Sequence, residues 1–267
     1  MIGAIIGDIV GSVYEFHNLK SKNFEFLGEH NYFTDDTVMS LAVAKAVAEY
    51  KKDGGNLGLM ATDCMRELGA IYPKAGYGPM FRQWLRSDNP KPYFSYGNGA
   101  AMRVSACGYA ASSIEEAKSL SKAVTEITHN HPEGLKGAEA IAVAVYLAKT
   151  GSSKEEIKRY VQENYYNMDF TLDGIRDRYK YHVSCQGSVP QALEAFFEST
   201  NFEDAIRNAI SIGGDSDTIG AMTGAVAEAY YGVPKNIRNR AENYLEPKLL
   251  SILLSFEKAY PPRAERE

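Results

Sequence analysis

The segment Gly3-Ala4-Ile5-Ile6-Gly7-Asp8-Ile9-Val10-Gly11 decides how the chain packs. Its three glycines are four positions apart and fall on one face of a helix, because a helix turns about every 3.6 residues. A glycine inside a helix costs about 1 kcal/mol relative to alanine, so three of them imply a packing demand that offsets this cost. The same spacing favours helix pairing in lipid, but Asp8 and Glu15 exclude a membrane span. We therefore expect this helix at the centre of a soluble bundle, with another backbone in close contact.

The two acids of this first segment, Asp8 and Glu15, are seven positions apart, which is about two turns of a helix. We expect the first helix to run from Gly3 to Phe16, so both side chains should lie on one face. The alternative for each acid is that it is solvated or paired with a buried arginine, which is the common situation of an isolated carboxylate.

Apolar residues recur at helical spacing along almost the whole chain, and no long strand-like alternation is present. The segment 138–149 consists almost entirely of Ala, Ile, Val and Leu, so we expect a buried, central helix there. No linker rich in Pro, Gly or Ser interrupts the chain, so we expect one domain over residues 1–259 and a polar, frayed tail over 260–267. The sequence predicts an all-α fold with helices at 38–50, 113–128, 138–149, 154–164, 188–199, 202–212 and 219–231.

The composition excludes several classes of protein. With a net charge of −5 over 267 residues, the chain lacks the basic surface of a nucleic-acid-binding module. No apolar run reaches the length of a membrane span, and the N-terminal segment has no basic leader, so we expect neither a membrane anchor nor a signal peptide. Cys64, Cys107 and Cys185 are far apart and lack the spacing of metal ligands, which indicates reduced thiols and a cytoplasmic protein.

Two short segments rich in oxygen ligands stand at the expected starts of helices. One is Thr34-Asp35-Asp36-Thr37, and the other is Gly213-Gly214-Asp215-Ser216-Asp217-Thr218. Mg²⁺ and Mn²⁺ prefer carboxylate, hydroxyl and water oxygens, so two such loops folded together predict a site for one or two divalent cations. The alternative is that both segments only cap their helices, since Thr and Asp accept hydrogen bonds from free N–H groups and complement the helix dipole.

The segment Tyr96-Gly97-Asn98-Gly99-Ala100-Ala101-Met102-Arg103 combines a tight turn with the start of a helix. N–H groups exposed at such a helix start suit a phosphate or a diphosphate. The same pattern also serves as an ordinary connector. For Arg103 we expect a structural role, either neutralising a buried carboxylate or holding a loop.

Two histidines lie in the segment Thr128-His129-Asn130-His131-Pro132-Glu133-Gly134. A zinc site is disfavoured, because no third nitrogen or sulfur ligand is supplied nearby and the histidines lack the i, i+4 spacing of helical zinc motifs. The segment is either a substrate-contacting loop or a structural loop. The long segment 72–98, rich in Gly, Pro and Tyr, is also expected to be functional.

Taken together, five segments resemble the ADP-ribosylglycohydrolase family. The resemblance implies a single-domain, all-α orthogonal helical bundle with a binuclear metal site at one end. It implies Mg²⁺ as the cofactor, with two ions bound, and Mn²⁺ as the substitute. The segments are Gly7-Asp8-x-x-Gly11-Ser12-x-x-Glu15, Thr34-Asp35-Asp36-Thr37, Gly97 to Arg103, Thr128-His129 and Gly213 to Thr218, in the family's order over most of the chain.

The resemblance also implies roles for individual residues. Glu15 matches an acid that has a catalytic part on a mobile flap, and Asp36 is the acid we expect next to the attacking water. His129 is expected at the ribose or the adenosine, whereas the role of His131 stays open. The implied metal ligands are Thr34, Asp35, Asp36, Asp215, Asp217 and Thr218, and the implied substrate-binding residues are Gly97, Asn98, Gly99, Met102, His129, Gly214 and Ser216.

The implied reaction is metal-dependent hydrolysis of the glycosidic bond between ADP-ribose and an acceptor, through an oxocarbenium-like state. The substrate is an ADP-ribosylated protein or a small ADP-ribose conjugate, and we expect a monomeric enzyme. Arginine-linked, serine-linked and O-acetylated ADP-ribose all stay open as substrates. The alternative function is a catalytically silent relative that binds ADP-ribose or is structural, like the lens crystallins of the family. The choice of acceptor is expected to lie in Tyr72, Tyr77, Tyr93, Tyr96 and the segment 173–182.

Overall fold

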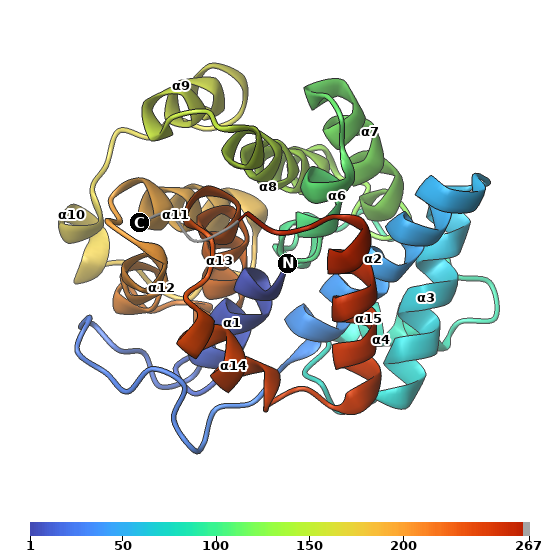
Figure 1. The fold of residues 1–267 in the computed structure, drawn as a ribbon, viewed down its shortest axis with the longest axis horizontal. Coiled ribbons are helices and arrows are strands. Elements are labelled where there is room, and N and C mark those ends of the chain that lie inside the picture. The colour runs from blue at the N-terminus through green and yellow to red at the C-terminus, as the bar shows by residue number, and fades with distance from the viewer. Residues whose placement is uncertain (264–267) are drawn as a thin grey trace.

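Helices account for nearly all of the regular structure in the computed structural model, which describes residues 1–263 (Figure 1). Within these residues, an isolated antiparallel bridge joins Gly97 and Ser184. The all-α prediction is thus confirmed. The helices are α1 (Ile2–Gly11), α2 (Asp35–Asp53), α3 (Leu57–Ile71), α4 (Pro79–Arg86), α5 (Gly99–Met102), α6 (Ser105–Ala110), α7 (Ile114–Thr125), α8 (Pro132–Thr150), α9 (Lys154–Asn164), α10 (Leu172–Arg176), α11 (Cys185–Phe197), α12 (Phe202–Ser211), α13 (Ser216–Tyr231), α14 (Lys235–Glu242) and α15 (Pro247–Ala259).

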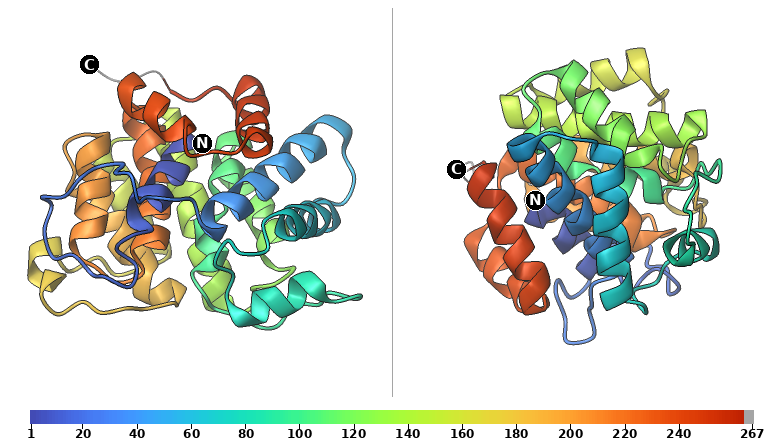
Figure 2. Two further views of the ribbon diagram at one scale, coloured as in Figure 1. Left: turned by 90° about the horizontal axis from the view of Figure 1, so that it is seen from below. Right: turned by 90° about the vertical axis from the view of Figure 1, so that its right-hand side faces the viewer.

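The helices cross at steep angles and form a single domain. Figure 1 shows α3 lengthwise and α12 nearly end-on, whereas the left view of Figure 2 shows α12 lengthwise and α3 nearly end-on. Helix α13 contacts α1, α8, α11 and α12 and is buried over almost its whole length. It therefore occupies the centre of the bundle, and α8, most of whose residues from Ala138 to Ala148 are buried, packs against it.

The close backbone approach predicted for the first helix is confirmed, and its partner is α13. A Cβ atom added at Gly7 would lie 1.9 Å from the carbonyl oxygen of Gly220, and one added at Gly220 would lie 2.5 Å from the carbonyl oxygen of Gly7. In the same way, a Cβ atom added at Gly3 would lie 2.3 Å from the carbonyl oxygen of Gly224. Real Cβ atoms do not approach backbone this closely, so only glycine permits the crossing of α1 and α13.

Several helices begin earlier than the apolar pattern predicts. Helix α2 starts at Asp35, α8 at Pro132 and α13 at Ser216. The polar residues that were expected to precede the helices therefore form their first turns. A helix's first turn has free N–H groups, so these residues are suited to capping as well as to binding a ligand. The segment 72–98, expected as loop, contains the short helix α4.

The first helix ends earlier than predicted. Helix α1 stops at Gly11, where the amide of Asn31 donates to the carbonyl oxygen of Ile9 (2.8 Å) and takes the place of a further helical turn. Glu15 therefore lies in the turn that follows the helix. The prediction that Asp8 and Glu15 share a face of one helix is wrong.

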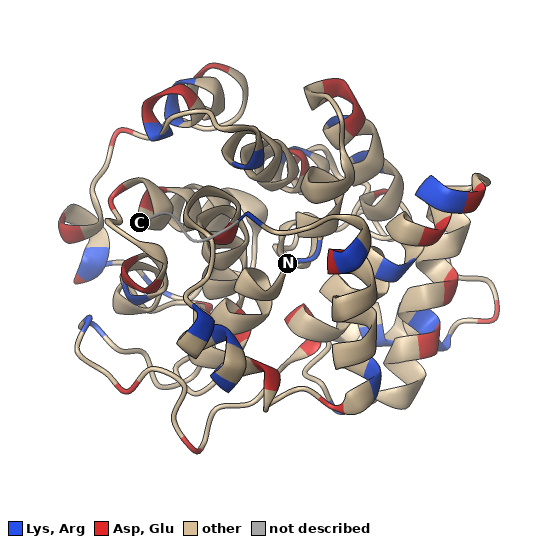
Figure 3. Cartoon of the chain, viewed as in Figure 1, with Lys and Arg blue, Asp and Glu red and all other residues tan. Residues whose placement is uncertain are grey.

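The C-terminal part of the described chain packs on the bundle. Tyr260, directly after α15, lies against Phe256, with 5.0 Å between the ring centroids. The predicted tail covers 260–267, of which residues 264–267 lie outside the described residues. Within residues 1–263, no helix combines the length and the apolar character that a membrane crossing requires. Figure 3 shows Lys and Arg interspersed with Asp and Glu on the outer helices α3, α7 and α9.

Candidate metal centre and substrate cavity

A cavity of about 490 Å³ gathers most of the predicted site residues. Its walls come from the turn after α1, the N-terminal ends of α2 and α13, the turn before α5, and His129. Segments far apart in the sequence thus meet at one place. The predicted residues that line the cavity are Glu15, Thr34, Asp35, Asp36, Gly97, Asn98, Gly99, Met102, His129, Asp215, Asp217 and Thr218.

Two predicted substrate-binding residues, Gly214 and Ser216, do not line this cavity. The Gly214 N–H donates to the side-chain oxygen of Asn18 (2.7 Å), and the Ser216 hydroxyl donates to the carbonyl oxygen of Tyr14 (3.3 Å). Gly214 also has a φ of 84°, a region that glycine adopts without strain. Both residues therefore fasten the turn that carries Glu15 to the start of α13.

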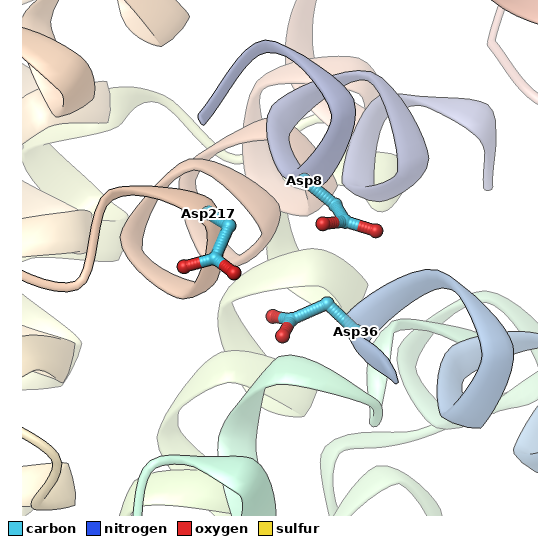
Figure 4. Close-up of side chains that lie close together, drawn as sticks. All are labelled: Asp8, Asp36 and Asp217. Carbon is cyan, nitrogen blue, oxygen red and sulfur yellow. The ribbon is translucent and has the colours of Figure 1, made fainter. Parts of the chain in front are cut away.

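Three buried carboxylates converge from three different helices. Oxygen atoms of Asp8 on α1, Asp36 on α2 and Asp217 on α13 lie within 4.8 Å of one another, and Figure 4 shows the three side chains close together. In a second group, oxygens of Glu15, Asp215 and Asp217 also lie within 4.8 Å of one another. Asp217 belongs to both groups, so the two acid clusters are adjacent.

Asp8 is fully buried and holds the start of α2. Its Oδ1 accepts the Thr34 hydroxyl (2.7 Å), and its Oδ2 accepts the N–H groups of Thr34 (2.9 Å) and Thr37 (3.0 Å). The two situations expected of an isolated acid, solvation and pairing with arginine, are therefore both wrong for Asp8. It caps α2 from a neighbouring helix and so fixes Thr34 relative to α1.

A side-chain cap is present at the first of the two predicted clusters and absent at the second. Thr34 caps α2, since its hydroxyl oxygen accepts the Asp36 N–H (3.2 Å). Asp215 stands at the corresponding position of α13, but its side chain makes no capping hydrogen bond and instead accepts from the amide of Asn98 (2.7 Å). Helix capping alone therefore does not account for Asp215.

The electrostatics of the cluster favour a bound cation. Burial, together with the charges of Asp8 and Asp35, raises the pKa of Asp36 well above its ordinary value. Burial and the neighbouring Asp36 do the same to the pKa of Asp217. The Oδ1 atom of Asp36 is buried and has no hydrogen-bond partner within the described residues. An orphaned carboxylate oxygen among crowded acids and hydroxyls is a donor set that fits Mg²⁺ or Mn²⁺.

The turn at Gly97-Asn98-Gly99 is bonded within the protein more fully than predicted. The Gly97 N–H donates to the Ser95 hydroxyl (3.1 Å), and the Asn98 N–H donates to the carbonyl oxygen of Val183 (2.8 Å). These two N–H groups are therefore occupied and do not form the free anion site that the sequence suggested. The amide side chain of Asn98 instead connects this wall of the cavity to Asp215.

His129 is a neutral side chain in the same wall, next to Gly97 and Gly99. Burial, with Arg103 nearby, holds its pKa well below the ordinary value, and its Nδ1 lies 2.8 Å from the Thr128 hydroxyl. Arg103 in turn donates to that hydroxyl (2.6 Å), so it holds the histidine loop. His131 has a structural position, because its Nδ1 accepts the Glu133 N–H at the start of α8 (3.1 Å).

We expect the metal-free protein to become less stable as the pH rises from 6.5 to 8. Burial raises the pKa of Glu15 and that of Asp35 to about 7, whereas carboxyl groups in an unfolded chain titrate near 4. The folded state thus holds protons that the unfolded state has already released, and this stabilisation is lost as the pH passes through about 7. Below about pH 6.5 the lowered pKa of His129 has the opposite effect on stability, because the unfolded state binds a proton at this histidine that the folded state does not. The interval therefore starts at pH 6.5.

Thermal unfolding in EDTA across this interval tests the expectation. The midpoint should be lower at pH 8 than at pH 6.5, and saturating Mg²⁺ should reduce the difference, because a cation then replaces the protons. A midpoint in EDTA that rises over the same interval would contradict the raised pKa values.

Comparisons with known proteins give a family and a fold for the chain. A family model described as ADP-ribosylglycohydrolase matches residues 1–260. The chain is 28% identical over 337 residues to ADP-ribosylhydrolase ARH3 of Mus musculus, covering 94% of this chain and 88% of the relative. It is 26% identical over 264 residues to the ADP-ribosyl-[dinitrogen reductase] glycohydrolase of Rhodospirillum rubrum, covering 87% and 84%. A solved structure titled "ADP-ribosylglycohydrolase-related protein complex" has the same fold, with a TM-score of 0.69, 22% identity and coverage of 96% of this chain and 95% of that one.

Proposed function

Because the chain belongs to the ADP-ribosylglycohydrolase family, we propose that it hydrolyses the glycosidic bond between ADP-ribose and an acceptor and releases ADP-ribose. The acceptor is a modified protein side chain or a small conjugate. The observation that carries the proposal is the convergence of Asp8, Asp36 and Asp217, of which Asp36 and Asp217 line the cavity and Asp36 has one unpartnered oxygen. Buried carboxylates this close together destabilise a protein unless a cation compensates their charge. A hydrolytic site that depends on a cation is a function that accounts for them.

Six residues would hold two divalent cations, Mg²⁺ or Mn²⁺. When bound, such cations supply positive charge for the ribose hydroxyls and lower the pKa of a coordinated water. Asp8 is proposed to support this set, because its oxygens accept hydrogen bonds from the N–H and hydroxyl groups of Thr34 and from the N–H group of Thr37. The six proposed ligands are Thr34, Asp35, Asp36, Asp215, Asp217 and Thr218.

Asp36 and Glu15 are the acids proposed to move protons. Asp36, whose pKa is raised well above its ordinary value by burial and by Asp8 and Asp35, is the acid proposed to accept a proton from the attacking water. Glu15, with its pKa raised to about 7 by burial and by Asp215, can hold or release a proton near neutral pH and is suited to the leaving group. Two carboxyl groups with separate tasks are the usual arrangement in glycoside hydrolysis.

The remaining cavity wall is proposed to bind the ADP-ribose itself. Gly97, Asn98, Gly99 and Met102 line one side, and the neutral His129 offers a hydrogen-bonding ring nitrogen rather than a charge. Gly97 and Gly99 lie close to the His129 ring, since a Cβ atom on either would come within 3.5 Å of its Nε2. Side chains larger than glycine there would narrow the space that a ribose or a diphosphate needs. Gly214 and Ser216 contribute by fastening the turn of Glu15.

A panel of defined substrates tests the proposed function. We expect release of ADP-ribose from at least one of arginine-linked, serine-linked and O-acetylated ADP-ribose with Mg²⁺ or Mn²⁺, and no release in EDTA. Release that is unchanged in EDTA would contradict the cation centre. Binding of ADP-ribose by titration calorimetry without any release would instead identify a binding protein.

A further inference from the structure

The turn that carries Glu15 is fastened to parts of the chain that lie far along the sequence. Asn18 accepts the Gly214 N–H (2.7 Å) and donates to the Glu15 carbonyl oxygen (2.9 Å). The Lys20 ammonium donates to the carbonyl oxygen of Tyr179 (2.8 Å). The turn after α1 and the segment around Tyr179 therefore lie against each other, although Lys20 and Tyr179 are 159 positions apart in the sequence.

Tyr181 is the residue of that second segment that reaches the Glu15 side chain. Its hydroxyl donates to Oε1 of Glu15 (3.0 Å). Its ring stacks on Phe16, with 6.2 Å between the centroids and 26° between the planes. Both rings line the cavity and are exposed, Phe16 at 74% and Tyr181 at 43%. The stacked pair thus forms the rim of the cavity on the side of Glu15.

The hydroxyl of Tyr181 counters the repulsion between the Glu15 carboxylate and its acidic neighbours. Glu15 is only partly buried, and its oxygen lies within 4.8 Å of oxygens of Asp215 and Asp217. Three like charges at this distance repel one another, and a Glu side chain at a cavity mouth is free to rotate toward water. Among the described residues, the hydrogen bond from Tyr181 is the side-chain contact that holds the carboxylate against this repulsion.

We propose that Tyr181 is a positioning residue for Glu15. Its hydroxyl orients the carboxylate toward Asp215 and Asp217, and its ring, stacked on Phe16, keeps the turn closed over the cavity. The inference rests on the proposed function, in which Glu15 exchanges a proton with the substrate. The sequence predicts that the segment 173–182 selects the acceptor. The inference gives one residue of this segment a role next to the reacting group.

A double-mutant cycle tests whether Tyr181 acts through Glu15. Tyr181→Phe should lower kcat about 10- to 100-fold with little change in KM, which is the size of effect typical of a residue that orients a functional group. In a Glu15→Ala background, adding Tyr181→Phe should change kcat by less than about 2-fold, because the group that it orients is gone. Tyr146→Phe removes a similar hydroxyl, bonded to the Ser112 carbonyl far from the cavity, and should leave kcat unchanged.

A second measurement does not depend on activity. In Tyr181→Ala, amide hydrogen exchange of residues 12–18 should accelerate in the metal-free protein, whereas exchange in α8 should stay as in the wild type. If the wild type releases no ADP-ribose, the proposed function fails, and this exchange experiment still decides the role of Tyr181. The inference is overturned if Tyr181→Phe has wild-type kcat, if its effect persists in the Glu15→Ala background, or if exchange of residues 12–18 is unchanged in Tyr181→Ala.

Discussion

Replacing Asp36 with Asn is expected to lower the rate of ADP-ribose release by about 10²- to 10⁴-fold, which is the range that a positioned acid or base contributes. The amide has nearly the same shape, so the loss would come from charge and proton affinity rather than from packing. The same change should raise the thermal midpoint of the metal-free protein. Asp36 is buried beside Asp8 and Asp35, and removing its charge relieves both the repulsion and the cost of burying it. Each kcal/mol gained corresponds to about 2–4 °C in a protein of this size.

The opposite signs of the two effects make Asp36→Asn informative. A mutation that merely disturbs the fold lowers activity and stability together, whereas one that removes a strained functional charge lowers activity and raises stability. Asp63→Asn is a suitable control, because it makes the same chemical change on the exposed surface of α3 and should alter neither quantity. Wild-type activity in Asp36→Asn would show that Asp36 is not part of the reaction.

Replacing Gly7 with Ala is expected to destabilise the protein by about 3 kcal/mol or more, the upper end of what one extra methyl group costs in a packed core. The added Cβ would lie 1.9 Å from the carbonyl oxygen of Gly220 and 2.2 Å from its carbonyl carbon. Both are backbone atoms, so no side chain can rotate away, and the clash is relieved only if α1 and α13 separate. Asp8 lies on α1 next to Gly7, so the acid cluster would be disturbed as well.

Chemical denaturation of Gly7→Ala, beside the matched variant Gly78→Ala, measures this effect. Nothing lies within 4 Å of a Cβ atom added at Gly78, and its φ of −58° is one that alanine adopts readily. Gly78→Ala should therefore be neutral or slightly stabilising. Equal stability of Gly7→Ala and Gly78→Ala would mean that α1 and α13 do not meet as closely as described.

Much of the helical architecture follows from periodicity and from glycine. The spacing of Gly3, Gly7 and Gly11 predicts a close approach of two backbones, since only that demand offsets three helical glycines. It does not predict the partner, because Gly220 and Gly224 on α13 lie in a segment whose apolar residues already account for its burial. A local pattern predicts the kind of contact that a helix face makes, whereas the whole fold determines which helix makes that contact.

The same limit explains what was missed at the site. Asp35, Asp36, Asp215 and Asp217 stand out because acids cluster at two helix starts. Asp8 does not stand out, since its hydrogen-bonding partners Thr34 and Thr37 follow 26 and 29 positions later. Glu15 was placed on a helix because nothing in the local sequence shows that Asn31 ends α1 at Gly11. The contact between Tyr181 and Glu15 spans 166 positions and leaves no local pattern.

The crossing of α1 and α13 also leads us to expect a particular order of folding. The Gly3 N–H donates to Glu228, 225 positions away, and all ten residues of α1 are buried in the native structure. Contacts between such distant segments form slowly, because a very long loop must close before they stabilise anything. We therefore expect α1 to gain protection late in refolding, which pulse-labelled hydrogen exchange would detect. The acid cluster would then assemble only in the final stage of folding. The carboxylates would therefore not repel one another in the earlier folding intermediates.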